Sequence, residues 1–375
     1  MTDAAALDIF LAAAPGLEET LRAEAAEAGF ANPRTAPGGV LVEGDWPEVW
    51  RANLVLRGAG RVLVRVAAFH AVHLAQLDKR ARRVDWPRLL PPGAVVRVDA
   101  TCQKSRIYHA GAAAQRIGRA LAEATGATLA PASTEGAIRV LTRIVDDLCV
   151  ISLDASGEPL HRRGHKLAVG KAPLRETLAA LFLRQCGFTG AEPVLDPMCG
   201  SGTFVLEAAE IARGLHPGRD RSFAFQTLAG FDPDAWDRLR LTSARPSPAW
   251  FFGYDRDAGA VEMARANAQR AGVDQIATFG QQPVSAFAPP RGLPAGLVMV
   301  NPPYGERIGE KDDLRPLYGT LGRVLRERFA GWRVGLVTSE PALAQATGLP
   351  FQPPGPPIPH GPLKIRLFRT GPLPA

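Results

Sequence analysis

The four residues Asn301-Pro302-Pro303-Tyr304 combine groups that could hold a flat molecule by its amino group. They follow the apolar run 296–300, which predicts a buried strand ending in a rigid loop. The Asn301 side-chain oxygen and the Pro302 carbonyl could each accept a hydrogen bond from an exocyclic amine, and the Tyr304 ring could stack on a base. Such acceptors would favour the charge that the nitrogen gains during group transfer. The plainer alternative is a proline-rich turn with a surface tyrosine.

A glycine-rich turn between a strand and a helix is predicted at DPMCGSGT, residues 196–203. Gly200 and Gly202 would let the backbone approach a ligand closely. A dinucleotide-binding pattern would require a third small residue where Val205 stands, and no phosphate-binding lysine of a P-loop is present. The turn therefore fits hydride or phosphoryl transfer poorly, and a purely structural tight turn remains the alternative.

Asp255 ends the predicted strand WFFGYD, 53 residues after Gly202. An acid at this position can accept hydrogen bonds from ribose hydroxyls. The insertion 215–249 explains the long spacing. In the alternative interpretation, Asp255 caps the helix that follows it.

The two motifs together predict a cradle for a ribose and an amino acid in which nothing requires a diphosphate. S-adenosylmethionine is the molecule that fits, and its sulfonium makes the methyl transfer a matter of positioning. Metal catalysis is not expected, since the sequence has no His/Cys cluster at ligand spacing.

The elements that must position these residues alternate between strands and helices from about residue 173 onward. This alternation predicts an α/β fold with a doubly wound, mostly parallel sheet of the Rossmann-like type, covered on both faces. Sites in such sheets lie beyond the carboxyl ends of the strands, so Asp196, Asp255 and Asn301 should converge. The preceding residues are predicted to form two small α+β units. In the strands 137–147 and 148–157, apolar and polar residues alternate, which predicts that one face is exposed to solvent.

The chain has 375 residues, a formal net charge of +7 and four scattered cysteines. These features predict a reduced, cytoplasmic protein, and no apolar run is long enough to cross a bilayer. Residues 79–116 hold nine basic residues against two acidic ones, and residues 161–175 hold five basic residues and no acid. Such concentrations suit a nucleic-acid partner. A solvated face combined with compositional bias toward arginine is the alternative.

DPMCGSGT and NPPYGER resemble class I methyltransferases that act on planar amino nitrogens. SRIYHAGAAAQRIGRAL (105–121), LHRRGHK (160–166), KAPLRETLAALFL (171–183), HPGRDRSFAFQTL (216–228) and HGPLKIRLFR (360–369) are similar to THUMP-containing RNA methyltransferases. The similarity is greatest to bacterial enzymes that methylate the 2-amino group of guanine in large-subunit ribosomal RNA. It implies a ferredoxin-like part at 1–48, a THUMP RNA-binding domain at 49–157 and a catalytic domain at 158–375.

The resemblance also implies roles for individual residues. Asn301, Pro302, Pro303 and Tyr304 would act on the target base, which is flipped into the site. The cofactor candidates are Asp196, Pro197, Gly200, Gly202, Thr203, Asp255, Arg256, Gln281 and Thr177. The candidates for RNA contact are Lys79, Arg80, Arg82, Arg83, Lys104, Arg106, Arg162, Arg163 and Lys166. Where many relatives carry an adenine-binding Asp, this sequence has Gln281 and Gln282, either of which could replace it.

The expected function is therefore guanine-N2 methylation of 23S ribosomal RNA by a monomer. Transfer RNA is an alternative substrate, since THUMP modules occur with both. Adenine-N6 methylation of DNA and methylation of protein glutamine share NPPY, but do not account for the N-terminal resemblance or the basic segments. A ribosome-assembly factor without catalysis is the alternative from another class.

Overall fold

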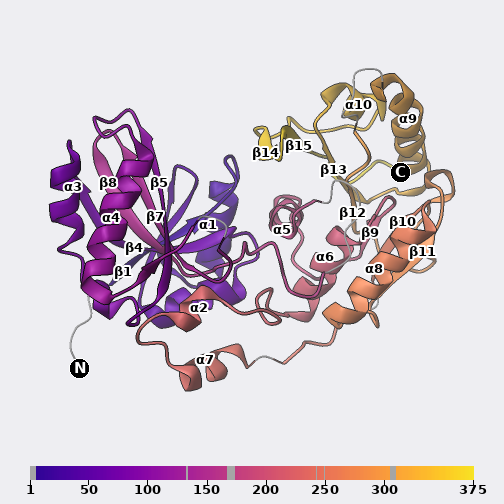
Figure 1. Ribbon diagram of the computed structural model, residues 1–375. Helices are drawn as coiled ribbons and strands as arrows, with labels where there is room; N and C mark the ends of the chain where they lie inside the picture. Colours follow the sequence, from indigo (N-terminus) through magenta and orange to yellow (C-terminus); the bar gives the residue numbers. More distant parts are fainter. Residues whose placement is uncertain (1–5, 132–133, 167–173, 242, 249, 305–309) are drawn as a thin grey trace. The chain divides into compact units, whose positions relative to one another are not determined.

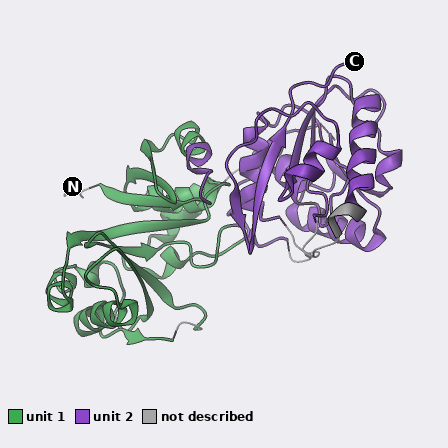
Figure 2. Ribbon diagram, turned by 90° about the horizontal axis from the view of Figure 1, so that it is seen from above, with its two compact units in different colours: residues 1–13, 22–160, 221–241 green, residues 14–21, 161–220, 242–375 purple. Residues whose placement is uncertain are grey.

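The computed structural model describes residues 6–131, 134–166, 174–241, 243–248, 250–304 and 310–375, with the side chains of 310–313 left out. The segments 305–307 of NPPYGER and 171–173 of KAPLRET lie outside the described residues. The chain forms two compact units (Figure 2). Unit 1 comprises residues 1–13, 22–160 and 221–241, and unit 2 comprises residues 14–21, 161–220 and 242–375.

Unit 1 is built on an eight-stranded mixed sheet with the order β2-β3-β1-β4-β8-β7-β5-β6 (Figure 1). Its strands are β1 (Leu7–Ala12), β2 (Ala31–Ala36), β3 (Gly39–Gly44), β4 (Arg61–His70), β5 (Val95–Gln103), β6 (Thr128–Leu129), β7 (Ile138–Val145) and β8 (Leu148–Asp154). Its helices are α1 (Glu18–Glu27, whose first four residues are grouped with unit 2), α2 (Trp46–Val55), α3 (Leu74–Ala81), α4 (Ala110–Thr125) and α7 (Pro233–Arg240), with 3₁₀ turns η1 (Trp86–Arg88) and η2 (Ala224–Thr227).

The prediction that one face of these strands is exposed to solvent is confirmed for β7 and wrong for most of β8. In β7 the core residues Ile138, Val140 and Ile144 alternate with more exposed ones. In β8, residues from Ile151 to Asp154 are buried on both faces. Asp154 lies on the face that was expected to be exposed to solvent. Its carboxylate is covered because it forms an ion pair with Arg61 of the adjacent β4.

The predicted irregular insertion contains an ordered segment that belongs to unit 1. Residues 221–241 carry Phe225 and Trp236, whose rings pack edge to face with centroids 5.0 Å apart. Phe225 also stacks on Trp50 of α2. The Asp232 carboxylate caps α7 by accepting from the Ala235 N–H at 3.0 Å. A buried aromatic cluster therefore fixes part of the segment that was expected to be an irregular insertion.

Unit 2 contains a seven-stranded sheet with the order β11-β10-β9-β12-β13-β15-β14 (Figure 1). Its strands are β9 (Val194–Asp196), β10 (Phe251–Asp255), β11 (Ala277–Gln281), β12 (Leu297–Val300), β13 (Arg333–Thr338), β14 (Ile358–His360) and β15 (Leu363–Arg369). Its helices are α5 (Glu176–Gln185), α6 (Thr203–Arg213), α8 (Ala258–Ala271), α9 (Glu310–Arg328) and α10 (Pro341–Ala346), with the 3₁₀ turn η3 (Val284–Ala286).

The first five strands of this sheet are parallel, and β15 and β14 extend it in antiparallel fashion. Alternate β12 residues face opposite layers. Val298 and Val300 join the core cluster with Leu321 of α9, and Met299 lies on the other side. The α/β, doubly wound prediction is confirmed. Within the described part of the chain, no helix is both long and apolar enough to cross a membrane.

Candidate active site

The strand order of unit 2 brings three predicted polar residues to one edge of the sheet. Asp196 ends β9, Asp255 ends β10, and Asn301 directly follows β12. β10 and β12 flank β9, and the chain leaves β9 toward β10 on one side before returning to β12 on the other. This is the point where a doubly wound sheet opens a crevice for a ligand.

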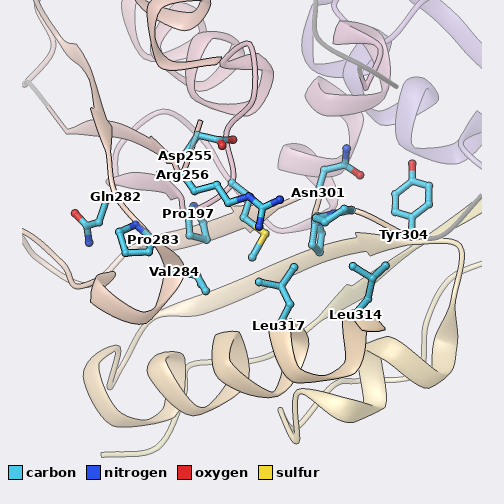
Figure 3. Close-up of a pocket in the computed structure, with 13 residues that line it drawn as sticks. Pro197, Asp255, Arg256, Gln282, Pro283, Val284, Asn301, Tyr304, Leu314 and Leu317 are labelled. Atoms are coloured by element: carbon cyan, nitrogen blue, oxygen red, sulfur yellow. The ribbon is translucent and has the colours of Figure 1, made fainter. Parts of the chain in front are cut away.

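A cavity of about 1000 Å³ lies at this edge. Figure 3 shows Asp255 and Arg256 on one side, Asn301 and Tyr304 on the other, and Leu314 and Leu317 projecting from α9. The residues that line the cavity are Pro197, Met198, Asp255, Arg256, Gln282, Pro283, Val284, Asn301, Pro302, Pro303, Tyr304, Leu314 and Leu317. The cavity thus combines apolar walls with a few polar groups.

Asn301 brings an unused hydrogen-bond acceptor to this cavity. Its Oδ1 atom is buried and receives no hydrogen bond from any residue that the structure describes. A buried acceptor without a donor is costly in a folded chain, so such atoms often mark a place where a ligand donates. The cavity therefore fits a ligand that carries an N–H group.

The loop that carries Asn301 is held in place by a hydrogen bond from α9. The Tyr318 hydroxyl of α9 donates to the Pro303 carbonyl at 3.2 Å and lies 3.4 Å from Thr338 Oγ1. Tyr318 is fully buried, and burial raises the pKa of its phenol, so the hydroxyl stays a donor. Together with the fixed φ angles of the two prolines, this bond sets the direction of the loop carbonyls.

Asp255 organises the glycine-rich turn. Its Oδ2 atom accepts the Gly200 N–H at 3.0 Å, and its Oδ1 atom accepts the Asp257 N–H at 3.0 Å. The N-cap of α8 is Asp257, whose side chain accepts from Gly259 N–H at 2.8 Å. The alternative that Asp255 caps this helix is therefore wrong, and Asp255 remains at the cavity wall.

The two conspicuous glycines of the turn differ in their surroundings. A Cβ added at Gly200 would meet nothing within 4 Å, although its φ of +51° is unfavourable for other residues. At Gly202 a Cβ would lie 3.1 Å from Phe279 Cε1 and 3.2 Å from Ala264 Cβ. Gly200 thus leaves open space at the turn, whereas Gly202 permits packing of α6 against its neighbours.

Asp196 is buried beneath the turn and does not line the cavity. Its Oδ1 atom accepts the Met198 N–H at 2.9 Å. Burial, together with the nearby Asp255 carboxylate, raises the pKa of Asp196 well above its ordinary value. Burial and the same two carboxylates also raise the pKa of Cys199 well above its ordinary range, so this thiol is a poor nucleophile.

We expect Asp196→Asn to alter the pH dependence of stability. A carboxyl with a raised pKa in the folded state contributes its full stability below the unfolded pKa of about 3.9, and this contribution is lost as pH rises toward the folded pKa. Asparagine keeps an acceptor for Met198 N–H but cannot ionise. The melting temperature of the variant minus that of the wild type should therefore increase between about pH 4 and pH 7. Parallel melting curves over this range would show that the Asp196 pKa is not raised.

The predicted cofactor residues thus divide into two groups. Pro197, Asp255 and Arg256 line the cavity, whereas Asp196, Gly200, Gly202, Thr203, Thr177 and Gln281 are not among its lining residues. The Gln281 amide donates to the Arg256 carbonyl at 3.0 Å, and Gln282 instead faces the cavity. Four apolar residues and one proline of the wall were not predicted: Met198, Val284, Leu314, Leu317 and Pro283. Among these, only the i, i+3 spacing of the leucines was a usable sequence signal.

Two of the predicted RNA contacts are wrong because their side chains are internal. Arg163 is 1% exposed and pairs with Glu207 of α6, with Nε and Oε1 3.0 Å apart. The Lys166 ammonium is bonded to Glu176 Oε1 at 2.8 Å and to Thr203 Oγ1 at 2.6 Å. These cations compensate buried acids of α5 and α6 and cannot meet a phosphate.

The adjacent arginines 162 and 163 provide a matched test of this assignment. Arg163→Ala removes the guanidinium that pairs with the buried Glu207 carboxylate, and we expect a loss of about 3–5 kcal/mol in the free energy of unfolding. Arg162 is exposed, and Arg162→Ala should cost less stability than Arg163→Ala. Urea denaturation of both variants measures the difference. Equal stabilities would contradict the internal role of Arg163.

The other predicted RNA contacts are exposed. Arg162 belongs to unit 2, and the six that belong to unit 1 are Lys79, Arg80, Arg82, Arg83, Lys104 and Arg106. Arg82 forms ion pairs with Asp78 and Glu123, and these two carboxylates reduce the positive electrostatic potential that Arg82 could offer to a phosphate. Among the described residues, no three His, Cys, Asp or Glu side chains form a group that could hold a metal ion.

The fold and the cavity define a class I methyltransferase. Residues 163–350 match the family described as RMKL-like, methyltransferase domain, and residues 8–63 match an RlmL ferredoxin-like domain. The chain therefore belongs to the RMKL-like methyltransferase family. The family prediction and the ferredoxin-like start are confirmed.

Individual relatives agree with this assignment. The ribosomal RNA large subunit methyltransferase K/L of Chromohalobacter salexigens is 34% identical over 98% of this chain and 51% of its own length. This chain spans about half the length of the curated relatives it matches. A predicted N6-adenine-specific DNA methylase from Listeria monocytogenes superposes with a TM-score of 0.87 at 30% identity, covering 98% of this chain and 97% of that one.

The predicted cofactor is consistent with a third relative. SMU.472, a putative methyltransferase complexed with SAH, has a TM-score of 0.86 at 25% identity and covers 99% of this chain and 100% of that one. SAH is what remains of S-adenosylmethionine after its methyl group has been transferred. S-adenosylmethionine is the cofactor of this class of fold, and the open space at Gly200 and the carboxylate of Asp255 fit it.

Proposed function

We propose that this chain methylates the 2-amino group of a guanine in 23S ribosomal RNA. The observation that carries the proposal is the buried Oδ1 atom of Asn301 at the cavity, which accepts no hydrogen bond from any described residue. Of the common bases, guanine offers a 2-amino group on its Watson–Crick edge. That group has two N–H donors, one for Asn301 Oδ1 and one for the Pro302 carbonyl.

The residues of NPPY would bind and orient the base. Tyr304 is half-buried at the cavity and would stack on a base that has left its helix. Bound S-adenosylmethionine supplies a methyl group on a sulfonium. Asn301 and Pro302 would hold the amine nitrogen in line with the methyl group. On transfer the sulfur would leave as the neutral thioether of S-adenosylhomocysteine, and the proton released by the nitrogen would pass to water. Cys199 has no part in this reaction, because its pKa is raised and its side chain is buried.

The cofactor would occupy the opposite side of the cavity. Asp255 would accept from the ribose hydroxyls while it holds the Gly200 N–H. Gln282 replaces Gln281 as the candidate for the adenine amine, because it lines the cavity and its backbone N–H donates to the Asp255 carbonyl at 2.8 Å. Val284 and Pro283 would pack on the adenine ring.

The RNA would be held by unit 1. This proposal is supported by the exposed basic residues of α3 and of the segments around it, and by relatives named for ribosomal RNA. We keep the prediction of a THUMP domain for residues 49–157 as part of this proposal. A ribosomal substrate would place the chain in the bacterial cytoplasm.

Adenine-N6 methylation of DNA is the second candidate, and the name of the Listeria relative favours it. An adenine 6-amino group offers the same two donors to NPPY, so the cavity alone does not discriminate. Transfer of tritiated methyl from S-adenosylmethionine to four substrates separates the candidates: ribosomal RNA, transfer RNA, DNA and protein from a strain lacking the gene. We expect label in ribosomal RNA. Label confined to DNA, protein or transfer RNA would contradict the proposal, and no label would favour a non-catalytic role.

A further inference from the structure

Tyr108 is the most exposed large apolar side chain in the described part of the chain, with 84% of its surface accessible. It lies in the loop between β5 and α4 of unit 1, where the preceding residue, Ile107, is buried at 4% exposure. Tyr108 itself makes no hydrogen bond or ring contact with any described residue. The loop is therefore attached to unit 1 by the buried Ile107 side chain, while the Tyr108 ring is exposed to solvent.

This loop is held rigidly by the turn between β7 and β8. The Arg106 N–H donates to Asp147 Oδ1 at 2.7 Å, and the Asp147 N–H donates to Ser105 Oγ at 3.0 Å. The Ser105 hydroxyl in turn donates to the Gln103 carbonyl at 2.7 Å. Lys104 adopts a φ of +47°, a conformation that non-glycine residues seldom take. Such strain persists only where the surroundings impose it, and it is frequently found at binding sites.

The loop that carries Tyr108 also holds two exposed cationic side chains. Lys104 is exposed, and the Arg106 side chain is 75% accessible. The turn between β7 and β8 carries two acids, Asp146 and Asp147. The Asp147 carboxylate already accepts the Arg106 N–H, and the Arg106 Nε lies 4.0 Å from it. A protein partner would need a wider apolar surface than one ring among charges. A flat, anionic ligand fits an aromatic face flanked by cations.

We infer that Tyr108 is a stacking platform for an unpaired nucleotide of the bound RNA, with Arg106 and Lys104 contacting the adjacent phosphates. The partner is a single-stranded or looped segment, because the faces of paired bases are covered by their neighbours in a duplex. The loop is fixed before binding, so little conformational entropy is lost when the base docks. This inference rests on the proposed function and adds to it the structure of the RNA that unit 1 selects.

Fluorescence anisotropy with the full chain tests the inference, with a labelled 12-nucleotide oligouridylate and a labelled 12-base-pair RNA duplex as probes. Tyr108→Ala should weaken oligouridylate binding about tenfold, and Tyr108→Phe, which keeps the ring, should stay within about twofold of the wild type. Leu241→Ala is the matched control, since Leu241 is 79% exposed in the same unit. It should bind both probes like the wild type.

The salt dependence separates stacking from charge. The slope of log affinity against log salt concentration should be unchanged in Tyr108→Ala and less steep in Arg106→Ala, because only the arginine displaces counterions. If Tyr108→Ala binds oligouridylate like the wild type, or loses duplex binding equally, the platform is refuted even where the chain methylates ribosomal RNA. If the wild type binds neither probe, the platform is refuted as well. Absence of methyl transfer to ribosomal RNA refutes the proposed function separately.

Discussion

Asn301→Ala should lower kcat/KM for methyl transfer by about 10²–10³-fold and leave cofactor binding nearly unchanged. This is the range observed when one pre-organised hydrogen-bonding group is removed from a site where charge develops. Asn301 Oδ1 has no donor among the described residues, so the loss of this atom breaks no hydrogen bond within the described part of the chain. Single-turnover transfer and calorimetric binding of S-adenosylmethionine measure the two effects.

The exposed amide Gln345 of α10 offers a matched control for Asn301. Gln345→Ala removes the same functional group in the same unit but away from the cavity lining. It should leave both the rate and the cofactor dissociation constant within about twofold of the wild type. Normal turnover by Asn301→Ala would contradict the assignment of the amine acceptor.

Asp255→Ala should raise the dissociation constant of S-adenosylmethionine by about 10–100-fold. Hydrogen bonds to a charged group contribute about 1.5–3 kcal/mol each, and this carboxylate also holds the Gly200 N–H that shapes the turn. The turn should lose its geometry when the carboxylate is absent. Isothermal titration calorimetry at neutral pH gives the dissociation constant directly.

Asp257→Ala separates ligand binding from helix capping. Asp257 lies two residues further on and caps α8 through the Gly259 N–H. Its removal should cost about 1 kcal/mol of stability but should not weaken cofactor binding. If Asp255→Ala and Asp257→Ala bind the cofactor equally well, Asp255 is not a ribose ligand.

The sequence predicted the sheet and the edge of the site because both depend on short-range patterns. Apolar runs that end in Asp196, Asp255 and Asn301 identify strands, and parallel strands place their carboxyl ends together. The sequence could not show that Arg162 is exposed while Arg163 is buried, because this depends on Glu207, 44 residues away from Arg163. A run of basic residues predicts net charge, but the position of each side chain depends on the acids that pack near it.

Two further differences between the sequence-based prediction and the structure also have their cause in tertiary contacts. Gln281 and Gln282 are equivalent as residue types, but Gln281, the last residue of β11, donates to the Arg256 carbonyl, whereas Gln282 lines the cavity. The insertion 215–249 lacks a long periodic pattern, yet residues 221–241 join unit 1 through aromatic contacts with Trp50. Neither outcome follows from local propensity.

In the proposed reaction, NPPY presents its acceptors to the 2-amino group of a guanine in ribosomal RNA. Mass spectrometry of nucleosides from 23S ribosomal RNA, taken from a strain lacking the gene and then treated with the pure chain and S-adenosylmethionine, tests it most directly. We predict a gain of N2-methylguanosine that Asn301→Ala does not produce. A gain of N6-methyladenosine instead, or of N2-methylguanosine with Asn301→Ala as well, would contradict the claim.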